Sequence, residues 1–234
     1  MMIQRFVLLL FLAAVTGVIA GGALSGDAPE LPTSNLDTPA GHFAPLRTGV
    51  TYRASSFPLP LRVTASDGKW GGAQWTATSR GKPAFGWAAV GRPPLDDPHG
   101  DIFIETAFGP TPSVSATIDR LRTGGSHLPD SHVGGVSFGE PRPARVAGYS
   151  GREFDGQVWG RFGKVLIPFS APTHGASPPD SFRLDQGEAF RVVALDVKGK
   201  TVVLFLESWK LPAQQFPAFV TSAQRLLETL RFDT

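Results

Sequence analysis

The chain has 234 residues, of which 41% are hydrophobic and 18% charged, and its formal net charge is only +2. No run of Lys and Arg is present, which excludes the electrostatic footprint of a nucleic-acid-binding protein. The absence of cysteine excludes disulfides, thiolate metal sites, a thiol nucleophile and a lipid-attachment cysteine. With 27 Gly and 21 Pro, the composition favours short strands joined by many loops.

Residues 1–24 carry an export signal. Arg5 precedes an apolar run that begins at Phe6, and small residues follow at 18–20, which is typical of a secretory signal peptide cleaved before Gly21. The alternative is a retained anchor, because residues 6–24 are just long enough to span a bilayer core. Both interpretations place the chain after Asp27 outside the cytoplasmic membrane, which it touches only through this segment.

Residues 25–48 have no periodic apolar pattern and several prolines, so we expect a Pro-rich linker in which His42 is solvated. The remaining residues, 49–234, are predicted to form a single α+β globular domain.

The domain begins with short strand-like runs. Residues 51–53 and 59–64 are predicted strands, and the prolines at 58 and 60 favour an edge position for the second. A turn is predicted at 67–72, followed by strands at 74–78 and 84–90. The aromatic residues here are either core filler, which we favour in a domain without disulfides, or a stacking platform for a glycan or peptide. They are Trp70, Trp75, Phe85 and Trp87.

The middle of the chain predicts one strand, one helix and further strands. Residues 101–106 alternate as a strand. Thr111 and Pro112 begin a helix with one apolar face, which ends at the glycines 124–125. That face consists of Val114, Ile118 and Leu121. Short strands are predicted at 135–139, 144–146 and 148–155 and a less regular one at 159–169, before a loop at 170–180.

The C-terminal residues predict a hairpin and a helix. Runs rich in β-branched residues at 191–197 and 201–207 are joined by Lys198 and Gly199, which pairs Val197 with Lys200 and Leu195 with Val202. The second run is apolar at both its odd and its even positions, so both faces of the strand are apolar. This predicts a central strand that is covered on both faces. A helical stripe follows, formed by Phe216, Phe219, Val220, Ala223, Leu226, Leu227 and Leu230. The fold predicted is α+β, with a mainly antiparallel sheet of about six to eight strands packed between two helices.

Ser137 lies in a G-x-S-x-G pattern at 135–139, which matches the nucleophile elbow of esterases. That elbow requires a helix directly after the serine, and Pro141 and Pro143 exclude one here. The segment is therefore interpreted as a strand with glycines at a bend. Similarly, residues 160–164 only superficially resemble a phosphate loop, because Val158 stands where the first glycine is required and Val165 follows the lysine.

Possible metal ligands occur in three loops. Residues 96–101 include His99 and three aspartates but lack the spacing of a calcium loop, and His174 lies in a Pro/Gly/Ser loop. His127, Asp130 and His132 offer two imidazoles and a carboxylate, and zinc usually takes four ligands, or three plus water, but Pro129 prevents a regular helix from positioning the two histidines. Solvated loops are the favoured interpretation, so the sequence assigns no catalytic, cofactor-binding or metal-ligating residue. The three strand carboxylates Glu153, Asp155 and Glu207 are predicted to form strand-edge salt bridges with Arg.

The C-terminal third resembles exported bacterial domains with the PsbP-like fold, a group named after an extrinsic photosystem subunit. The resemblance is carried by residues 193–207 and 216–232, with the glycine-bend strand at 148–155 in the same order. It implies an antiparallel sheet between helices and a non-enzymatic role in binding or assembly, and it carries over no functional residue.

These observations favour an exported, non-enzymatic domain that binds a cell-envelope protein or glycan at the outer face of the membrane, without a cofactor. The rival hypothesis is a secreted hydrolase, metal-dependent or not, that uses His99, His127 or His132 together with carboxylates. Convergence of these histidines with Asp130 in one pocket would favour the hydrolase.

Overall fold

The structure is a computed structural model of the chain, and it describes most of the residues after position 27. The described ranges are 28–34, 44–55, 57, 59–75, 85–89, 99–106, 113–123, 126–127, 134–160, 165–168, 181–184, 186–209 and 211–233. The predicted signal peptide or anchor therefore lies outside them. No helix within the described ranges combines the length and the apolar character needed to cross a bilayer.

The C-terminal hairpin has the predicted register. Strands β14 (Ala189–Val197) and β15 (Lys200–Trp209) pair Val197 with Lys200 and Leu195 with Val202. Lys198 and Gly199 both have positive φ, 52° and 80°, as a two-residue turn of this hand requires. On its other side β15 pairs with β7 (His99–Thr106), so the prediction of a central strand is confirmed.

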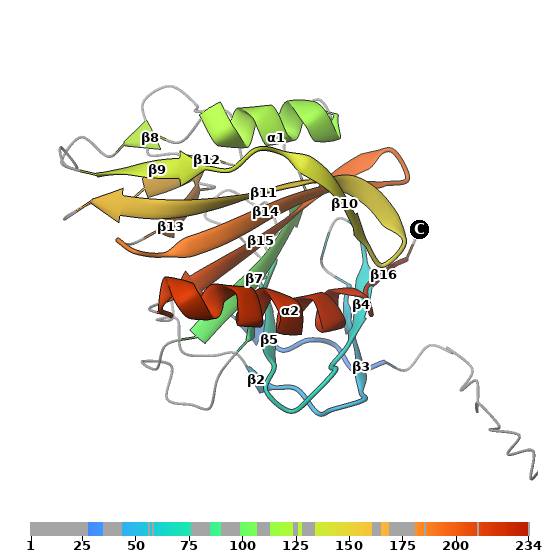
Figure 1. Ribbon diagram of the computed structural model, residues 1–234. Coiled ribbons are helices and arrows are strands. Elements are labelled where there is room, and N and C mark those ends of the chain that lie inside the picture. The colour runs from blue at the N-terminus through green and yellow to red at the C-terminus, as the bar shows by residue number, and fades with distance from the viewer. Residues whose placement is uncertain are drawn as a thin grey trace, which may run out of the picture.

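This hairpin lies within a ten-stranded, mainly antiparallel sheet (Figure 1). The strands follow the order β1-β5-β6-β7-β15-β14-β11-β10, and β2 and β9 pair with β5 and β11. The bounds of the other strands are β1 Thr33–Ser34, β2 Ala44–Pro45, β5 Gly71–Trp75, β6 Phe85–Ala89, β9 Gly134–Phe138, β10 Arg142–Val146 and β11 Tyr149–Gly160. The pairing of β1 with β5 is parallel.

Two three-stranded sheets accompany the large one. The first consists of β16 (Arg231–Phe232), β4 (Leu61–Thr64) and β3 (Thr51–Ala54), and the second of β13 (Ser181–Leu184), β12 (Val165–Pro168) and β8 (Ser126–His127). The α+β class and the mainly antiparallel pairing are confirmed. The described residues contain more strands than predicted, because two-residue pairings such as β1, β8 and β16 are too short to show a period of two.

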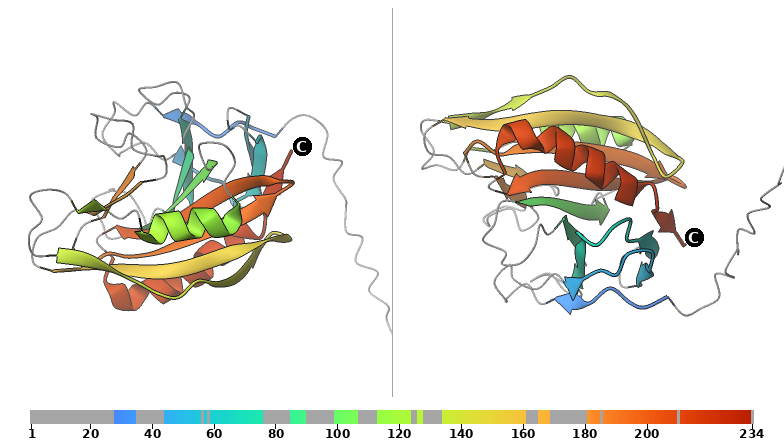
Figure 2. Two further views of the ribbon diagram at one scale, coloured as in Figure 1. Left: turned by 90° about the horizontal axis from the view of Figure 1, so that it is seen from above. Right: turned by 60° about the horizontal axis from the view of Figure 1, so that its bottom comes forward.

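Helices α1 (Val114–Thr123) and α2 (Phe216–Leu227) cover opposite faces of the large sheet (Figures 1 and 2). Along β14 and β15 the apolar side chains alternate between two cores. The smaller core joins α1 to residues such as Val192, Val203 and Phe205, and the larger joins α2 to Val193 and Leu204. The prediction of a sheet between two helices is therefore confirmed for this part of the chain.

Parts of the segment predicted as a linker pack on the fold. Leu31 and Leu46 are 1% and 4% exposed and belong to the larger core. The amide Nε2 of Gln74 donates a hydrogen bond of 2.8 Å to the carbonyl of Leu31. Residues 28–34 and 44–48 therefore pack on the domain, each through one buried leucine, whereas the sequence predicted a linker over 25–48.

The strand predicted over 59–64 occupies a different position from the one expected. It begins at Leu61 as β4, and it lies in the middle of its sheet, between β16 and β3. Pro60 precedes the strand, so its missing N–H removes no ladder bond, and its carbonyl accepts a hydrogen bond of 2.6 Å from the amide of Asp233. Strand β10 begins at Arg142, before the strand predicted at 144–146, and so includes Pro143; it lies at the end of the sheet order, where a proline is tolerated.

Candidate functional site

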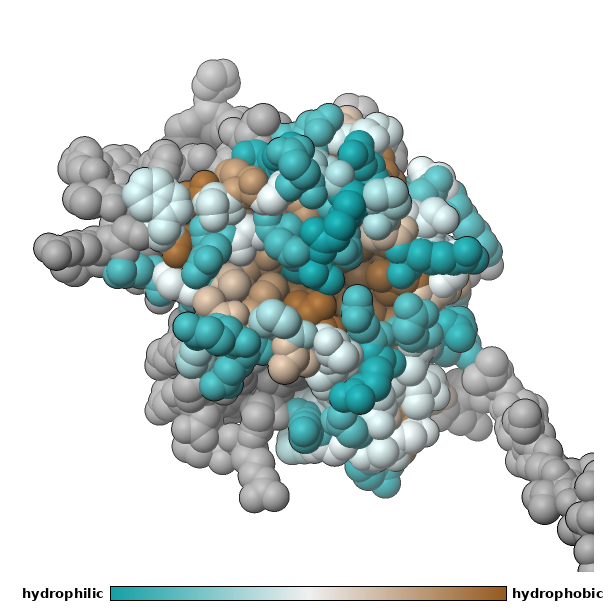
Figure 3. All heavy atoms as spheres, in the orientation of Figure 1, coloured by the Kyte–Doolittle hydropathy of each residue, from teal (hydrophilic) through white to brown (hydrophobic). Residues whose placement is uncertain are grey.

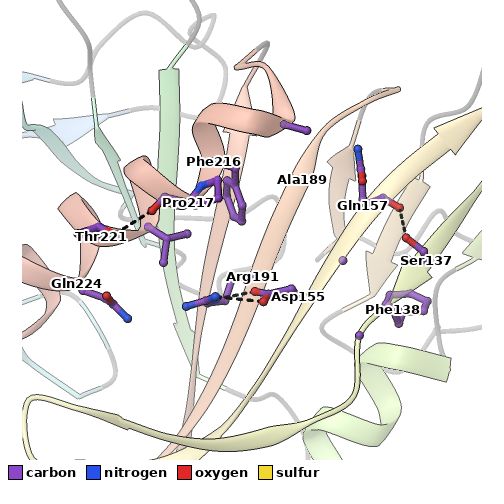
Figure 4. Close-up of a pocket in the computed structure, with 14 residues that line it drawn as sticks. Ser137, Phe138, Asp155, Gln157, Ala189, Arg191, Phe216, Pro217, Thr221 and Gln224 are labelled. Atoms are coloured by element: carbon purple, nitrogen blue, oxygen red, sulfur yellow. Dashed lines mark hydrogen bonds and ion pairs between the residues drawn. The ribbon is translucent and has the colours of Figure 1, made fainter.

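An open groove with a volume of about 700 Å³ lies between α2 and the sheet. Figure 3 shows apolar residues along this hollow, with hydrophilic residues on the sheet side and on the helix side. Strands β9, β11 and β14 and the residues from Ala213 to Gln224 form its walls (Figure 4). The lining residues are Ser137, Phe138, Gly139, Asp155, Gly156, Gln157, Ala189, Arg191, Ala213, Phe216, Pro217, Val220, Thr221 and Gln224.

The groove exists because α2 covers only part of the sheet. The helix packs against β7 and β4, with Phe219, Ala223 and Leu226 buried beneath it. Strand β11 extends beyond the covered area, and its residues at odd positions face the same side as α2 while Phe154 and Val158 enter the core beneath α1. The odd positions Asp155 and Gln157 are consequently available to solvent and line the groove.

Four charged side chains form a paired network at the floor. Asp155 accepts hydrogen bonds from Arg191, at 2.6 Å from Nε and 3.1 Å from Nη2, and from Arg142 Nη2 at 2.8 Å. Glu153 lies 2.7 Å from Arg142 Nη2 and 3.7 Å from Arg191 Nη1. Two guanidinium groups thus neutralise two carboxylates, so this part of the floor carries no net charge. The predicted pairing of Glu153 and Asp155 with Arg is confirmed.

The network keeps Asp155 ionised. Partial burial alone would raise the pKa of the Asp155 carboxyl, but the hydrogen bonds and charges of Arg191 and Arg142 together outweigh it. The pKa of Asp155 therefore lies below its ordinary value of 3.8. Burial likewise lowers the pKa of the Arg142 guanidinium, and its contacts with Asp155 and Glu153 more than reverse this effect. A general acid or base at neutral pH needs a pKa near 7, so Asp155 is suited to structure and binding.

The lowered pKa of Asp155 predicts a pH-dependent contribution to stability. A carboxyl whose folded pKa is depressed stabilises the fold above its unfolded value of about 3.9 and loses this contribution as pH falls through the folded pKa. Asp155→Asn is expected to lower the free energy of unfolding by about 1 kcal/mol at pH 7, discounted because the side chain is 41% exposed. The difference from the parent protein should shrink towards pH 3. Urea unfolding at both pH values measures it.

Glu140→Gln is the control for this measurement, because Glu140 forms a single ion pair with Arg122 and is 91% exposed. A stability difference for Asp155→Asn that stays constant from pH 7 to pH 3 would contradict the role of an ionised Asp155.

Uncharged polar groups surround the network. The hydroxyl of Ser137 donates a hydrogen bond of 3.3 Å to the carbonyl of Gln157, and that of Thr221 donates one of 2.9 Å to the carbonyl of Pro217. Both hydroxyls keep acceptor capacity, and the exposed amides of Gln157 and Gln224 both donate and accept. Figure 4 shows these side chains from opposite walls of the groove.

The structure brings together few of the residues considered from the sequence. Ser137 lies within β9, and β10 rather than a helix follows, which agrees with its interpretation as a strand residue. His99 and His127 lie on β7 and β8, in two different sheets. The other histidines and loop carboxylates, at 42, 96–97, 130, 132 and 174, lie outside the described residues. Within the described ranges no group of three or more His, Cys, Asp or Glu side chains is placed to hold a metal ion.

Glu207, like Glu153 and Asp155 on β11, lies on a strand with partners on both sides, so none of the three carboxylates stands on an edge strand. Glu207 lies on the central strand β15, directly opposite Asp101 on β7, and both residues are buried, at 5% and 6% exposure. The edge part of the prediction is therefore wrong for all three carboxylates, while the pairing with Arg holds for Glu153 and Asp155.

The groove residues missed from the sequence include Arg191, Gln157 and Gln224, and Arg142 was missed as their neighbour in the charged network. One signal was present: Arg191 stands at the same parity as Val193 and Leu195 in a run that is otherwise apolar. A charged residue at a core-facing position indicates a place where the core opens to solvent or to a ligand.

The fold and the groove define an α+β domain with an open groove on one face of its sheet. No protein-family model matches the chain, and no curated protein matches it. Among solved structures, LpqN of Mycobacterium tuberculosis, described as involved in cell envelope biogenesis, is similar at a TM-score of 0.30 and 10% sequence identity, over 86% of this chain and 89% of that one. This TM-score is too low for the comparison to assign a fold family or a function.

Proposed function

We propose that the chain is an exported, non-enzymatic domain that binds a protein or cell-envelope ligand at the outer face of the membrane, through the groove between α2 and the sheet. The N-terminal residues 1–24 support export, since a basic residue followed by an apolar run is the signal for it. The groove is the observation that carries the binding role: its volume of about 700 Å³ lies within the range of roughly 300–1,000 Å³ in which proteins bind small molecules.

Binding is favoured over catalysis by the chemistry of the floor. A nucleophile needs an adjacent base, and the hydroxyl of Ser137 donates to a backbone carbonyl. An acid or base needs a pKa near neutrality, and Asp155 is held ionised by two guanidinium groups. What the floor offers is a fixed set of hydrogen-bonding groups beside apolar surface from Phe216 and Val220, which is the usual make-up of a binding site.

Filling the groove tests the proposal. Gln224→Trp places a large side chain at an exposed groove position of α2, without removing a core contact. The tagged full-length chain, expressed in its own host, is captured with its bound partners from the envelope fraction. We expect Gln224→Trp to reduce the captured ligand about tenfold, because the groove is occupied.

Arg225→Trp is the matched control, since it adds the same side chain at the adjacent exposed position of α2, which does not line the groove. Equal capture by the two variants would place the ligand elsewhere on the molecule. Metal analysis of the same preparations addresses the hydrolase: stoichiometric zinc without a captured partner would overturn the binding role.

A further inference from the structure

An exposed tryptophan stands at one end of the groove. Trp159 is 58% exposed, and it is the large hydrophobic residue that the described part of the chain leaves open to solvent. It lies on β11 at the same parity as Asp155 and Gln157, so it faces the groove side of the sheet. Its cross-strand partner is Gly135, and the next pair along is Ser137 with Gln157. The tryptophan therefore continues the groove floor by one residue pair.

The indole ring is held against the sheet. A Cβ atom at position 135 would lie 2.8 Å from the Trp159 ring, which shows that the ring packs directly on the backbone of Gly135. A glycine opposite an aromatic residue leaves space for the ring to lie down on the strand. One surface of the ring is thus covered, and the rest is an apolar surface exposed to solvent. Because the ring is already held in place, little side-chain entropy is lost when a ligand stacks on it.

The groups beside this ring are suited to an uncharged ligand with many hydroxyls. Gln157, Ser137 and Gln224 supply amide and hydroxyl groups that both donate and accept, as a sugar hydroxyl does. The charged floor presents Asp155 and Arg191, which are 41% and 17% exposed, as an acceptor next to a donor. Because the network is electrically balanced, it gives no net attraction to an anion or a cation.

An extended peptide fits the same surface less well. Strand β11, which carries Asp155, Gln157 and Trp159, is hydrogen-bonded to β14 on one side and to β9 and β10 on the other, so this strand offers a peptide no free edge along its described residues. A peptide lying over β11 would have to satisfy its backbone groups through side chains alone. A sugar chain has no such requirement, because each of its hydroxyls can bond to a side chain separately.

We propose that the groove binds a neutral oligosaccharide, with one pyranose ring stacked on Trp159 and neighbouring sugars hydrogen-bonded by Gln157 and Gln224. The C–H groups of a pyranose face are weakly positive and meet the negative face of the indole ring. This proposal rests on the proposed function and names its ligand class.

Calorimetric titration of the full chain, purified from the exported fraction, tests the ligand class. The probes are four neutral hexasaccharides, maltohexaose, cellohexaose, chitohexaose and mannohexaose, and one anionic hexasaccharide, hexagalacturonate. We expect binding of at least one neutral probe and weaker or no binding of hexagalacturonate. Trp159→Ala should weaken the binding of that neutral probe about tenfold, and Trp159→Phe, which keeps an aromatic face, should weaken it less.

Arg225→Ala is the control and should bind as the parent protein does, because Arg225 is exposed and does not line the groove. Thermal unfolding of each variant verifies the fold. No binding of any neutral probe, or an affinity unchanged by Trp159→Ala, would overturn the glycan assignment. If Gln224→Trp still reduces envelope capture about tenfold in that case, the proposed function stands with a protein segment as ligand. If it does not, both proposals fall.

Discussion

Gly151→Ala is expected to lower the free energy of unfolding by about 3 kcal/mol. This value is the upper end of the usual range for adding an atom where no space is left. An added Cβ atom at this position would meet the carbonyl group of Ala194, lying 2.9 Å from its carbon and 3.0 Å from the Cα of Leu195. These are backbone atoms of β14, so they cannot move aside as the end of a flexible side chain could. The change would force β11 away from β14, and with it the floor of the groove.

Urea unfolding of the purified chain measures the effect, with Ser150→Ala as the control. Ser150 is the adjacent exposed residue of β11, and its replacement should change stability by less than about 0.5 kcal/mol. A Gly151→Ala variant within about 1 kcal/mol of the parent would show that the two strands do not approach as closely as this structure places them.

The elements that the sequence predicted best are those with a strong apolar period. The apolar stripe from Phe216 to Leu227 fits only a helix, and Lys198-Gly199 between two strand-like runs fits only a tight hairpin turn. The structure contains both. The stripe of α1 was recognised for the same reason, since Ile118 and Leu121 are buried at helical spacing.

The N-terminal part was less predictable because its anchors have no period. Leu31 and Leu46 are isolated apolar residues among prolines. Their partners come later in the chain: both side chains lie beside Gly72 of β5, and the amide of Leu31 donates a hydrogen bond to the carbonyl of Arg53 in β3. The pattern of neighbouring residues in the sequence does not indicate a partner that is distant along the chain. The prediction of one globular domain over 49–234 stays a prediction, since large parts of that range lie outside the described residues.

The groove was beyond sequence reasoning because four separate elements form it. Ser137, Gln157, Arg191 and Gln224 come from β9, β11, β14 and α2, and only the pairing order of the sheet brings them together. Individual pairs were accessible: the carboxylates Glu153 and Asp155 stand two residues apart on a strand, which places both on one face. Their partner Arg142 lies across the hairpin turn, opposite Glu153, at a register that the sequence did not define.

The position of the groove wall depends on contacts made by the end of the chain. After α2, strand β16 pairs with β4, and the hydroxyl of Thr229 bonds to the carbonyl of Thr64 at 3.0 Å. Arg62 Nε lies 3.2 Å from the carboxylate of Asp233. These contacts fix the C-terminal end of α2 to the N-terminal part of the chain (Figure 1). The helix can therefore stand beside β11 without covering it.

Arg191→Met is expected to lower the free energy of unfolding by about 2–3 kcal/mol at pH 7, between the effects measured for exposed and buried ion pairs. The guanidinium is 17% exposed and serves both carboxylates, at 2.6 Å from Asp155 and 3.7 Å from Glu153, which is 15% exposed. Without it, two close carboxylates share Arg142 alone. Methionine retains the apolar stem that packs on the sheet, so the loss reports mainly on charge.

Arg142→Met is the matched control, since it removes a guanidinium from the same network at a position that is 43% exposed, and it should cost only about 1 kcal/mol. The loss of stability in Arg191→Met should diminish between pH 5 and pH 3. The pKa of the paired Asp155 is depressed, so its contribution to the free energy of unfolding is present above about pH 3.9 and disappears as the pH falls below that value. Combining Arg191→Met with Asp155→Asn should recover part of the loss, since the remaining Arg142 then faces one carboxylate. Strictly additive losses in the double variant would mean that Arg191 and Asp155 do not act as a pair. The groove floor would then lack the balanced network on which the proposed binding of an uncharged ligand depends.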